Sequence, residues 1–378
     1  MKRILFCTPA PLTKALGAAK VVVELAEEMR LIGWKCDLIC PTDIATSGDR
    51  TPQQSFAANL GPFLKANASD YDVVDYDHEY LPFARAELAL RTLFVARSVL
   101  LAQHLDQIAI PIGTSLKSRL AHIIKEKTRR QERYRRVLNA QSIVEQADLV
   151  NVSNDLDKVE LMRRGLPSEK IVVLPYGISR TRRFSFDQVS SQPPSKPVIS
   201  FVGTFDYRKG ASEFPKIVEI VVAAVPEVLF KLFGTKGMFQ TEAEVRAHFP
   251  HRLQAYLEIL PTYLPEDLPH LLSSCSVGIF PSYVEGMPFG VLEMLAASVP
   301  VVAYASPGAP MMLPNEFLVQ RGHAEALAQK TIALIQSERA LMEARASAKQ
   351  QSQKFTWTAV AQQTDAVYRQ ALKELRAD

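Results

Sequence analysis

Short apolar runs alternate along this chain with longer stretches in which apolar residues recur every three or four positions. The short runs have the length of buried strands, and the longer stretches have the spacing of helices that pack through one face. The first unit of this kind is a strand at 2–7, a helix at 21–32 and a second strand at 34–40. This order requires a crossover connection, so it predicts a parallel sheet.

The same alternation continues and falls into two halves. Further strands are expected at 71–75, 91–96, 147–153 and 171–175, and then at 198–202, 229–233, 277–280 and 301–303. Between the halves, 180–197 is rich in Ser, Gln, Pro and Arg and shows no periodicity, which is typical of a linker. A chain of 378 residues is also too long for one ordinary core. We therefore predict domains at 1–180 and 198–354, joined by a linker at 181–197.

Composition narrows the class of protein. With 47% hydrophobic and 22% charged residues, the chain has the balance of a globular protein. It has no run of about 18 apolar residues, so we expect no transmembrane helix. The N-terminus starts with basic residues, but the apolar run that follows is only about five residues long, which indicates a first strand and not a signal peptide. These features predict a cytoplasmic protein, and a net charge of +4 is too small to indicate a nucleic-acid partner.

The four cysteines give no sign of a metal site. Cys7, Cys36, Cys40 and Cys275 show neither CxxC nor Cys/His ligand spacing. We interpret them as buried free thiols in a reducing compartment, with a disulfide or metal role as the alternative.

Most of the candidate chemistry lies in the stretch 280–304. A strand ends there at Phe280, and the loop that follows carries Glu285. A helix is expected from about Phe289, with Glu293 about one turn inside it. The unpaired N–H groups of a helix N-terminus suit a phosphate, and carboxylates suit the paired hydroxyls of a sugar. This combination indicates a sugar nucleotide; the alternative is a surface loop followed by a capping glutamate.

Glu285 and Glu293, with seven residues between them, resemble the E-x7-E element of retaining glycosyltransferases of family 4, which have the GT-B fold. A second loop carries a matching feature. The strand 198–202 is followed by Gly203 and then by Arg208-Lys209-Gly210, which resembles the phosphate-binding Arg/Lys element of that family. In many relatives the arginine lies a few residues before the lysine, so the adjacency here is a departure and Lys209 is the safer assignment. Two solvated cations are the alternative.

The resemblance covers both halves of the chain and implies an α/β architecture of two doubly wound, Rossmann-like parallel-sheet domains with an interdomain cleft. The first domain would bind the acceptor and the second the donor, and the last helix, 355–378, would pack back on the first domain. Trp357 would then be a packing anchor more readily than a sugar platform. By the same resemblance, Glu293 holds the ribose and Glu285 the transferred sugar, while Arg208 and Lys209 stabilise the leaving diphosphate. The further donor-side residues are Gly17, Gly203, Gly234, Met287, Pro288, Phe289 and Gly290.

The first half offers candidates for the acceptor side. His78 lies in a polar cluster, 75–79, at the end of a strand, and Arg97 follows the next strand, with His104 shortly after it. Polar side chains at the carboxyl ends of parallel strands are where open α/β sheets place their sites. We therefore take these three as acceptor-side catalytic candidates, although each histidine could instead be structural. The loop after the first strand has Gly17 but no GxGxxG pattern, which argues against a dinucleotide-binding dehydrogenase. The resemblance makes Gly17 and Lys20 acceptor-side or phosphate-side candidates, and a solvated helix residue is the alternative for Lys20.

Residues 117–136 contain nine basic residues against two acidic ones, with an apolar stripe in the first half only. A basic amphipathic helix of this kind could rest on anionic lipid at the inner face of a membrane or hold a lipid pyrophosphate. A solvated helix face is the alternative.

The predicted reaction moves a hexose from a nucleotide-diphosphate sugar to an acceptor hydroxyl with retention of configuration, in glycan, polysaccharide or glycolipid synthesis. The acceptor could be a glycan, a lipid-linked sugar or a small molecule. No metal or other cofactor is expected, because cations and helix N-termini can balance the diphosphate. The alternatives are a sugar-nucleotide epimerase of the same fold, a non-catalytic sugar-nucleotide binding protein, and a glycoside hydrolase, which would need two carboxylates flanking one bond.

Overall fold

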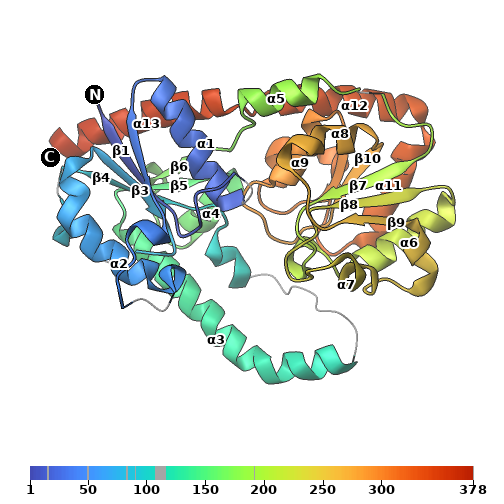
Figure 1. Cartoon of the computed structure of the whole chain (residues 1–378), viewed down its shortest axis with the longest axis horizontal. Coiled ribbons are helices and arrows are strands. Elements are labelled where there is room, and N and C mark those ends of the chain that lie inside the picture. The colour runs from blue at the N-terminus through green and yellow to red at the C-terminus, as the bar shows by residue number, and fades with distance from the viewer. Residues whose placement is uncertain are drawn as a thin grey trace. The chain divides into compact units, whose positions relative to one another are not determined.

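The computed structural model describes residues 1–14, 17–48, 51–81, 84–89, 91–106, 116–190 and 192–377, and of 18, 53, 54, 106 and 116–129 it describes the backbone alone. The chain divides into two compact units (Figure 1). The first unit consists of Met1–Gln107, Lys127–Ser179 and Phe355–Asp378, and the second of Ile108–Glu126 and Arg180–Lys354. Each unit is built around one parallel sheet, as the strand and helix alternation predicts.

The first unit has a six-stranded sheet in the order β2-β1-β3-β4-β5-β6. Its strands are β1 (Arg3–Cys7), β2 (Lys35–Ile39), β3 (Val73–Asp77), β4 (Leu93–Arg97), β5 (Leu149–Val152) and β6 (Ile171–Val173). Its helices are α1 (Gly17–Leu31), α2 (Pro52–Asn67), α4 (Asp155–Arg163) and α13 (Trp357–Ala377), and α3 (Leu116–Gln146) starts in the segment grouped with the second unit. All neighbouring strands pair in parallel. From β1 the chain goes first to β2 on one side and then to β3 on the other.

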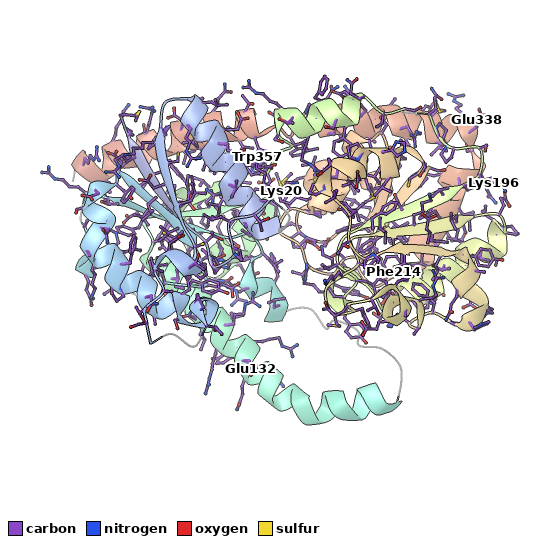
Figure 2. The ribbon with its side chains drawn as sticks, viewed as in Figure 1. Lys20, Glu132, Lys196, Phe214, Glu338 and Trp357 are labelled. Atoms are coloured by element: carbon purple, nitrogen blue, oxygen red, sulfur yellow. The ribbon has the colours of Figure 1, made fainter. Side chains whose placement is uncertain are left out.

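The last helix, α13, lies against α1 in the first unit (Figure 1). Trp357 starts this helix and is fully buried, with its ring stacked on Tyr176 at a centroid distance of 5.9 Å. Its indole N–H donates to Glu24 of α1, and Figure 2 shows it beside that helix. Trp357 is therefore a packing anchor, because none of its surface is left to face a ligand.

The second unit repeats the architecture with a sheet in the order β12-β11-β10-β7-β8-β9. Its strands are β7 (Val198–Val202), β8 (Leu229–Phe233), β9 (Leu257–Leu260), β10 (Val277–Phe280), β11 (Val301–Tyr304) and β12 (Leu318–Val319). Its helices are α5 (Arg180–Asp187), α6 (Phe214–Ala224), α7 (Glu242–Arg246), α8 (Leu268–Ser273), α9 (Phe289–Ala296), α10 (Ala309–Met312), α11 (Ala324–Gln336) and α12 (Glu338–Ser352). The chain runs from β7 to β8 and β9 on one side, and β10 then returns to the other side of β7. Phe214, labelled in Figure 2, packs its ring edge-on against Phe201 of β7 at 5.0 Å and so fixes α6 to the sheet.

Some elements differ from the sequence predictions. The aperiodic stretch after residue 180 forms the helix α5. Burial of Phe186, which is 1% exposed, stabilises this helix, because local propensity alone does not. The strands expected from the sequence do not include β9, a strand of four residues that contains the exposed Glu258. The N-cap of α4 is Asn154, whose side chain accepts from the Asp157 N–H at 2.9 Å.

The four cysteines are buried and free, as expected. Among the helices in the described part of the chain, none combines the length and apolar character that crossing a bilayer requires.

Candidate functional site

The loop from β10 to α9 carries the first predicted carboxylate, Glu285. Its side chain is only 9% exposed, so its charge must be balanced inside the protein. The Oε1 atom accepts hydrogen bonds from Ser282 Oγ at 2.7 Å, Lys209 Nζ at 2.6 Å and Arg208 Nη1 at 3.0 Å. The structure therefore brings Arg208, Lys209 and Glu285 together into one cluster, which we call the charge triad.

The loop from β7 to α6 holds the two cations in place. Asp206 caps its turn, accepting from the Lys209 N–H at 2.9 Å and from the Thr204 hydroxyl at 2.8 Å. Gly210 has φ +85, and a Cβ atom there would lie 2.3 Å from the carbonyl oxygen of Pro281. Only glycine permits this left-handed turn to lie so close to the β10 loop, which explains the Lys-Gly pair seen in the sequence.

Within the charge triad, the effects of burial and of opposite charge act against each other. Burial raises the pKa of Glu285, but the charges of Lys209 and then Arg208 outweigh that effect, so the pKa is lowered overall. Burial lowers the pKa of Lys209, and the charge of Glu285 opposes this. The Lys209 ammonium also lies 5.1 Å from the centroid of the Phe280 ring, which favours the cation. Two cations and one carboxylate leave a net positive charge, and that suits an anionic ligand.

The charge triad lies at the point in the second sheet where the order of the strands reverses. Strands β7 and β10 are neighbours, yet β7 is followed by β8 on the far side. Loops that leave such a pair of strands diverge, and open α/β sheets bind ligands outside the carboxyl ends of strands at this switch point. The topology thus places Arg208, Lys209 and Glu285 where a ligand of the second unit is expected.

The N-terminus of α9 lies beside the same strand ends. Pro288 is its N-cap, and Met287 and Phe289 flank that residue. A Cβ atom on Gly290 would lie 2.2 Å from the carbonyl oxygen of Val202, so glycine allows the first turn of α9 to touch the end of β7. The N–H groups that open this helix carry partial positive charge, which adds to that of the cations.

Two further predicted glycines follow strand ends in the second unit. Gly203, after β7, has φ +148, and a Cβ there would lie 3.5 Å from the Lys209 side chain. Gly234, after β8, has φ +74, and a Cβ there would lie 3.0 Å from the Tyr263 ring. Gly203 therefore lies beside the charge triad, and Gly234 lies beside an aromatic ring that follows β9.

Glu293 lies inside α9 and is 6% exposed. Its Oε1 atom accepts from Arg182 Nη2 at 2.6 Å, and Arg182 Nη1 donates to the Pro265 carbonyl at 2.9 Å. The two predicted carboxylates thus have different cationic partners, which is consistent with separate tasks.

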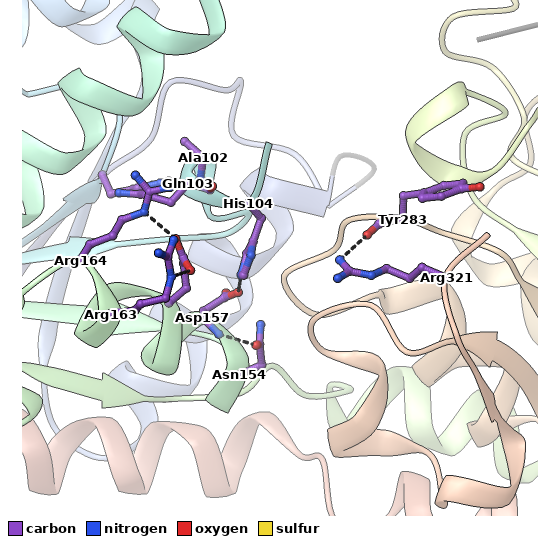
Figure 3. Close-up of polar contacts among 11 residues, drawn as sticks. Ala102, Gln103, His104, Asn154, Asp157, Arg163, Arg164, Tyr283 and Arg321 are labelled. Atoms are coloured by element: carbon purple, nitrogen blue, oxygen red, sulfur yellow. Dashed lines mark hydrogen bonds and ion pairs between the residues drawn. The ribbon is translucent and has the colours of Figure 1, made fainter. Parts of the chain in front are cut away.

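Three residues that the sequence analysis did not single out support this site. Ser282 and Arg182 bind the two carboxylates directly. Glu213, just before α6, accepts from the Tyr283 hydroxyl at 2.9 Å, and the Tyr283 carbonyl accepts from Arg321 Nη1 at 3.4 Å (Figure 3). These contacts anchor the residues that precede Glu285. Ser282 could have been noticed because it follows a strand end, whereas Arg182 and Glu213 carry no local signal.

In the first unit, Gly17 is the first residue of α1, is exposed, and would meet nothing within 4 Å if it carried a Cβ. Lys20, labelled in Figure 2, is 8% exposed, so its interpretation as a solvated helix residue is wrong.

Arg97 is part of a buried network and is 3% exposed. Its Nε and Nη2 atoms donate to the two carboxylate oxygens of Asp75 at 3.0 and 2.5 Å. The Tyr368 hydroxyl of α13 donates to the same carboxylate at 2.6 Å. This network joins β3, β4 and α13, so the geometry gives Arg97 a structural task, and its predicted catalytic role stays untested.

His78 and His104 occupy separate buried positions. His78 is 1% exposed, its Nε2 atom accepts from the Ala102 N–H at 3.5 Å, and burial lowers its pKa to about 4. His104 forms a 2.8 Å contact from Nε2 to Asp157 Oδ1 (Figure 3). Burial raises the pKa of Asp157, and the bond to His104 opposes that rise. The His78 backbone N–H donates to the Arg97 carbonyl at 3.0 Å, where β3 pairs with β4.

The chain is similar to known glycosyltransferases. Residues 196–337 match the family model described as "Glycosyl transferases group 1". The Escherichia coli (strain K12) protein WcaL, named for a colanic acid biosynthesis glycosyltransferase, is 27% identical over 212 residues, which are 52% of this chain and 50% of WcaL. The chain thus spans about half the length of the curated relative it matches. Both matches support the resemblance to group 1 glycosyltransferases, whereas family 4 membership and retention of configuration stay predictions.

Solved structures match over almost the whole chain. Sucrose-phosphate synthase from Thermosynechococcus elongatus has a TM-score of 0.71 at 18% identity, covering 99% of this chain and 100% of that one. The Anabaena protein Alr3699/HepE, solved in complex with UDP and glucose, has a TM-score of 0.67 at 14% identity, covering 98% and 100%. Identities this low bear on the fold alone. Together with the two six-stranded parallel sheets, they confirm the GT-B fold class expected from the sequence.

Proposed function

We propose that this chain is a retaining glycosyltransferase that moves a hexose from a nucleotide-diphosphate sugar to an acceptor hydroxyl, without a metal ion. The second unit binds the donor and the first unit binds the acceptor. The acceptor belongs to glycan, polysaccharide or glycolipid synthesis. Two relatives support this choice. The E. coli protein is named for colanic acid biosynthesis, and the Anabaena protein was solved with UDP and glucose.

The charge triad carries this proposal. Arg208, Lys209 and Glu285 meet at the switch point of the second sheet, beside the N-terminus of α9. A net positive cluster next to a helix N-terminus suits a diphosphate, and a carboxylate within hydrogen-bond reach suits the sugar that the diphosphate carries.

The donor would rearrange the contacts of the charge triad. The diphosphate brings more negative charge to Arg208 and Lys209 than one carboxylate does, so it competes with Glu285 for the cations. Glu285 then accepts hydrogen bonds from hydroxyls of the sugar, while Glu293 accepts those of the ribose. Met287, Pro288, Phe289 and Gly290 lie along the phosphates, and Gly203 leaves room beside Lys209.

Transfer breaks the bond between the anomeric carbon and the leaving phosphate oxygen and forms a bond from the acceptor oxygen to that carbon. Negative charge grows on the diphosphate during this step, so the cations stabilise the transition state more than the ground state. The acceptor proton passes to a phosphate oxygen on the same face, which gives retention without a protein nucleophile. The cations and the helix N-terminus balance the charge, so the proposal needs no metal ion.

His78 and His104 remain candidates for acceptor contacts, and the protein acts in the cytoplasm. We assign peripheral membrane contact to 117–136, of which the side chains of 117–129 lie outside the described residues. In the described part of this stretch, Tyr134 is 58% exposed, and Leu138 just beyond it is 51% exposed.

Calorimetric titration with UDP, GDP and ADP in EDTA tests the donor site. One nucleotide should bind, and Lys209→Ala and Glu293→Ala should each weaken it by about tenfold to hundredfold, as expected for loss of a charged hydrogen bond. Lys231→Ala is the matched control, since Lys231 is similarly buried and pairs with Glu258 away from the site. Absence of binding by all three nucleotides would refute the donor site.

The matching nucleotide sugars then test the reaction. NMR should show an α-linked donor giving an α-linked product once an acceptor is added. An epimerised nucleotide sugar formed without acceptor would point to the epimerase, and binding without any turnover to a non-catalytic protein.

A further inference from the structure

Arg182 connects three parts of the second unit. It lies in α5, in the stretch whose sequence is typical of a linker, and its side chain is 16% exposed. One guanidinium nitrogen donates to Glu293 of α9 and the other to the Pro265 carbonyl just before α8. The guanidinium carbon lies 5.7 Å from the centroid of the Phe186 ring, which packs against it from the same helix.

This arrangement orients Glu293. The carboxylate and the guanidinium are both largely buried, so their attraction is less screened than at the surface. The rigid, planar fork of an arginine fixes the direction of each hydrogen bond. Because the second arm of the fork is held by the backbone at Pro265, the direction of the first arm toward Glu293 is fixed as well.

A carboxylate held in this way can still receive a ligand. An ionised carboxylate accepts about four hydrogen bonds, so the contact through Oε1 is compatible with hydroxyl donors from a sugar. The cationic guanidinium of Arg182 lies 2.6 Å from this carboxylate, and an ionised carboxylate only accepts hydrogen bonds. The pair therefore resembles a prepared acceptor of hydroxyl groups more than a structural ion pair alone.

Tyr263 lies close enough to Glu293 and Arg182 for both charges to act on its phenol. Burial raises the pKa of its phenol, and the negative charge of Glu293 raises it further, while Arg182 lowers it. The ring faces Gly234 after β8, where an added Cβ would come within 3.0 Å of it. The ends of β8 and β9 and the helix α9 thus supply Gly234, Tyr263 and Glu293 to one neighbourhood, next to the charge triad along the same sheet edge.

We propose that Arg182 is a positioning residue for nucleoside recognition, which orients Glu293 to accept the 2′- and 3′-hydroxyls of the ribose, with Tyr263 bordering the same subsite. The second unit therefore distinguishes ribonucleotides from 2′-deoxyribonucleotides through a residue outside the E-x7-E element. This inference rests on the proposed function, because it takes the ligand to be a nucleoside diphosphate.

The test compares each nucleoside diphosphate with its 2′-deoxy form by calorimetry, using whichever of UDP, GDP and ADP binds the unmodified protein. We expect the unmodified protein to prefer the ribonucleotide by about tenfold or more, as for one hydrogen bond to a charged group. In Arg182→Met this preference should fall to less than about threefold, through weaker ribonucleotide binding and little change for the deoxy form. Arg183→Met is the matched control, because Arg183 lies in the same helix and donates to the Ser352 carbonyl instead.

The ratio of the affinities for the ribonucleotide and its 2′-deoxy form distinguishes a positioning role of Arg182 from a merely structural one. If Arg182→Met weakens both nucleotides equally, or leaves the preference within about twofold of the unmodified protein, the inference is wrong. If Arg182→Met does not fold, Arg182→Lys decides, since lysine can reach Glu293 but cannot hold Pro265 as well. An intermediate preference in Arg182→Lys would support the inference, and an unchanged one would overturn it. Failure of the unmodified protein to bind any nucleotide would instead overturn the proposed function, and this inference with it.

Discussion

Changing Glu285 and changing Lys209 should shift nucleotide affinity in opposite directions. In the structure one oxygen of Glu285 binds both cations, at 2.6 Å from Lys209 and 3.0 Å from Arg208. A diphosphate has to replace these bonds. Glu285→Gln removes the competing charge and leaves the cations, whereas Lys209→Met removes one of the cations that the diphosphate needs.

The structure sets the size of each effect. Lys209 and Glu285 are 14% and 9% exposed, so their bond is largely shielded from solvent. A hydrogen bond to a charged group contributes about 1.5–3 kcal/mol, so Lys209→Met should weaken binding of the nucleoside diphosphate about tenfold to hundredfold. A glutamine oxygen can still accept from the cations, so Glu285→Gln should strengthen binding more modestly, by about threefold to tenfold, although it loses sugar transfer.

Protein stability should follow the opposite order. Lys209→Met leaves one carboxylate facing Arg208 and the Ser282 hydroxyl, a balanced arrangement. Glu285→Gln removes the negative charge that both cations bind directly, so it should lower the free energy of unfolding by more, about 2–4 kcal/mol against about 1–2 kcal/mol. A saturating nucleoside diphosphate should restore most of the loss in Glu285→Gln, because it supplies the missing negative charge.

Calorimetry with the nucleoside diphosphate and urea unfolding, each with and without the nucleotide, measure these effects. Lys231→Met controls for loss of a lysine in the same unit, because its partner Glu258 is 55% exposed and the pair should contribute less than about 1 kcal/mol. If Glu285→Gln weakens nucleotide binding as Lys209→Met does, Glu285 does not compete with the diphosphate, and the mechanism proposed for the charge triad is wrong.

Other predictions address packing, pH and the membrane. Gly290→Ala should destabilise the protein by about 2 kcal/mol in urea unfolding, because its Cβ would press on the Val202 carbonyl at the end of β7; unchanged stability would contradict that packing. Burial lowers the pKa of His78 to about 4, so protonation of this histidine favours the unfolded state below about pH 6.5. Burial raises the pKa of Asp77 to about 7, so protonation of this carboxylate favours the folded state over the same range. Asp77→Asn removes the effect of Asp77 and leaves that of His78. Its free energy of unfolding should therefore fall by about 3 kcal/mol more than that of the unmodified protein from pH 7 to pH 4. Parallel pH profiles would contradict the raised pKa of Asp77. Changing Arg130, Arg133 and Arg135 together to glutamine should weaken binding to phosphatidylserine vesicles, measured by flotation, about hundredfold or more. Equal binding of the unmodified protein to neutral vesicles would refute the membrane contact.

The strands could be located from the sequence because a buried parallel strand is a continuous apolar run between turn residues. Val198–Val202 and Val277–Phe280 satisfy this condition, and the structure places both strands where the pattern predicts. Leu257–Leu260 does not, since the outward-facing Glu258 interrupts four residues at the edge of the sheet. Edge strands need less apolar sequence, so the pattern that finds central strands misses them.

Part of the charge triad could be predicted from the sequence in the same way. A glycine after a strand and a carboxylate after the neighbouring strand each mark a strand end, and parallel topology brings strand ends to one edge. The sequence could not show that Glu285 would take both cations on one oxygen, because that depends on how far the Gly210 turn approaches Pro281. Contacts within a loop follow from sequence order, whereas contacts between loops follow from packing.

The place of Arg182 beside Glu293 could not be predicted from the sequence. Arg182 is 111 positions from Glu293 and lies in a stretch without helical periodicity. The helix that carries it forms because Phe186 is buried against the second unit, so its position depends on tertiary packing and not on local propensity. If the nucleotide experiments support its task, the recognition of the ribose in this protein depends on the segment that joins the two halves of the chain. The segment would then be part of the donor site, and shortening or replacing it as a neutral linker would weaken ribonucleotide binding.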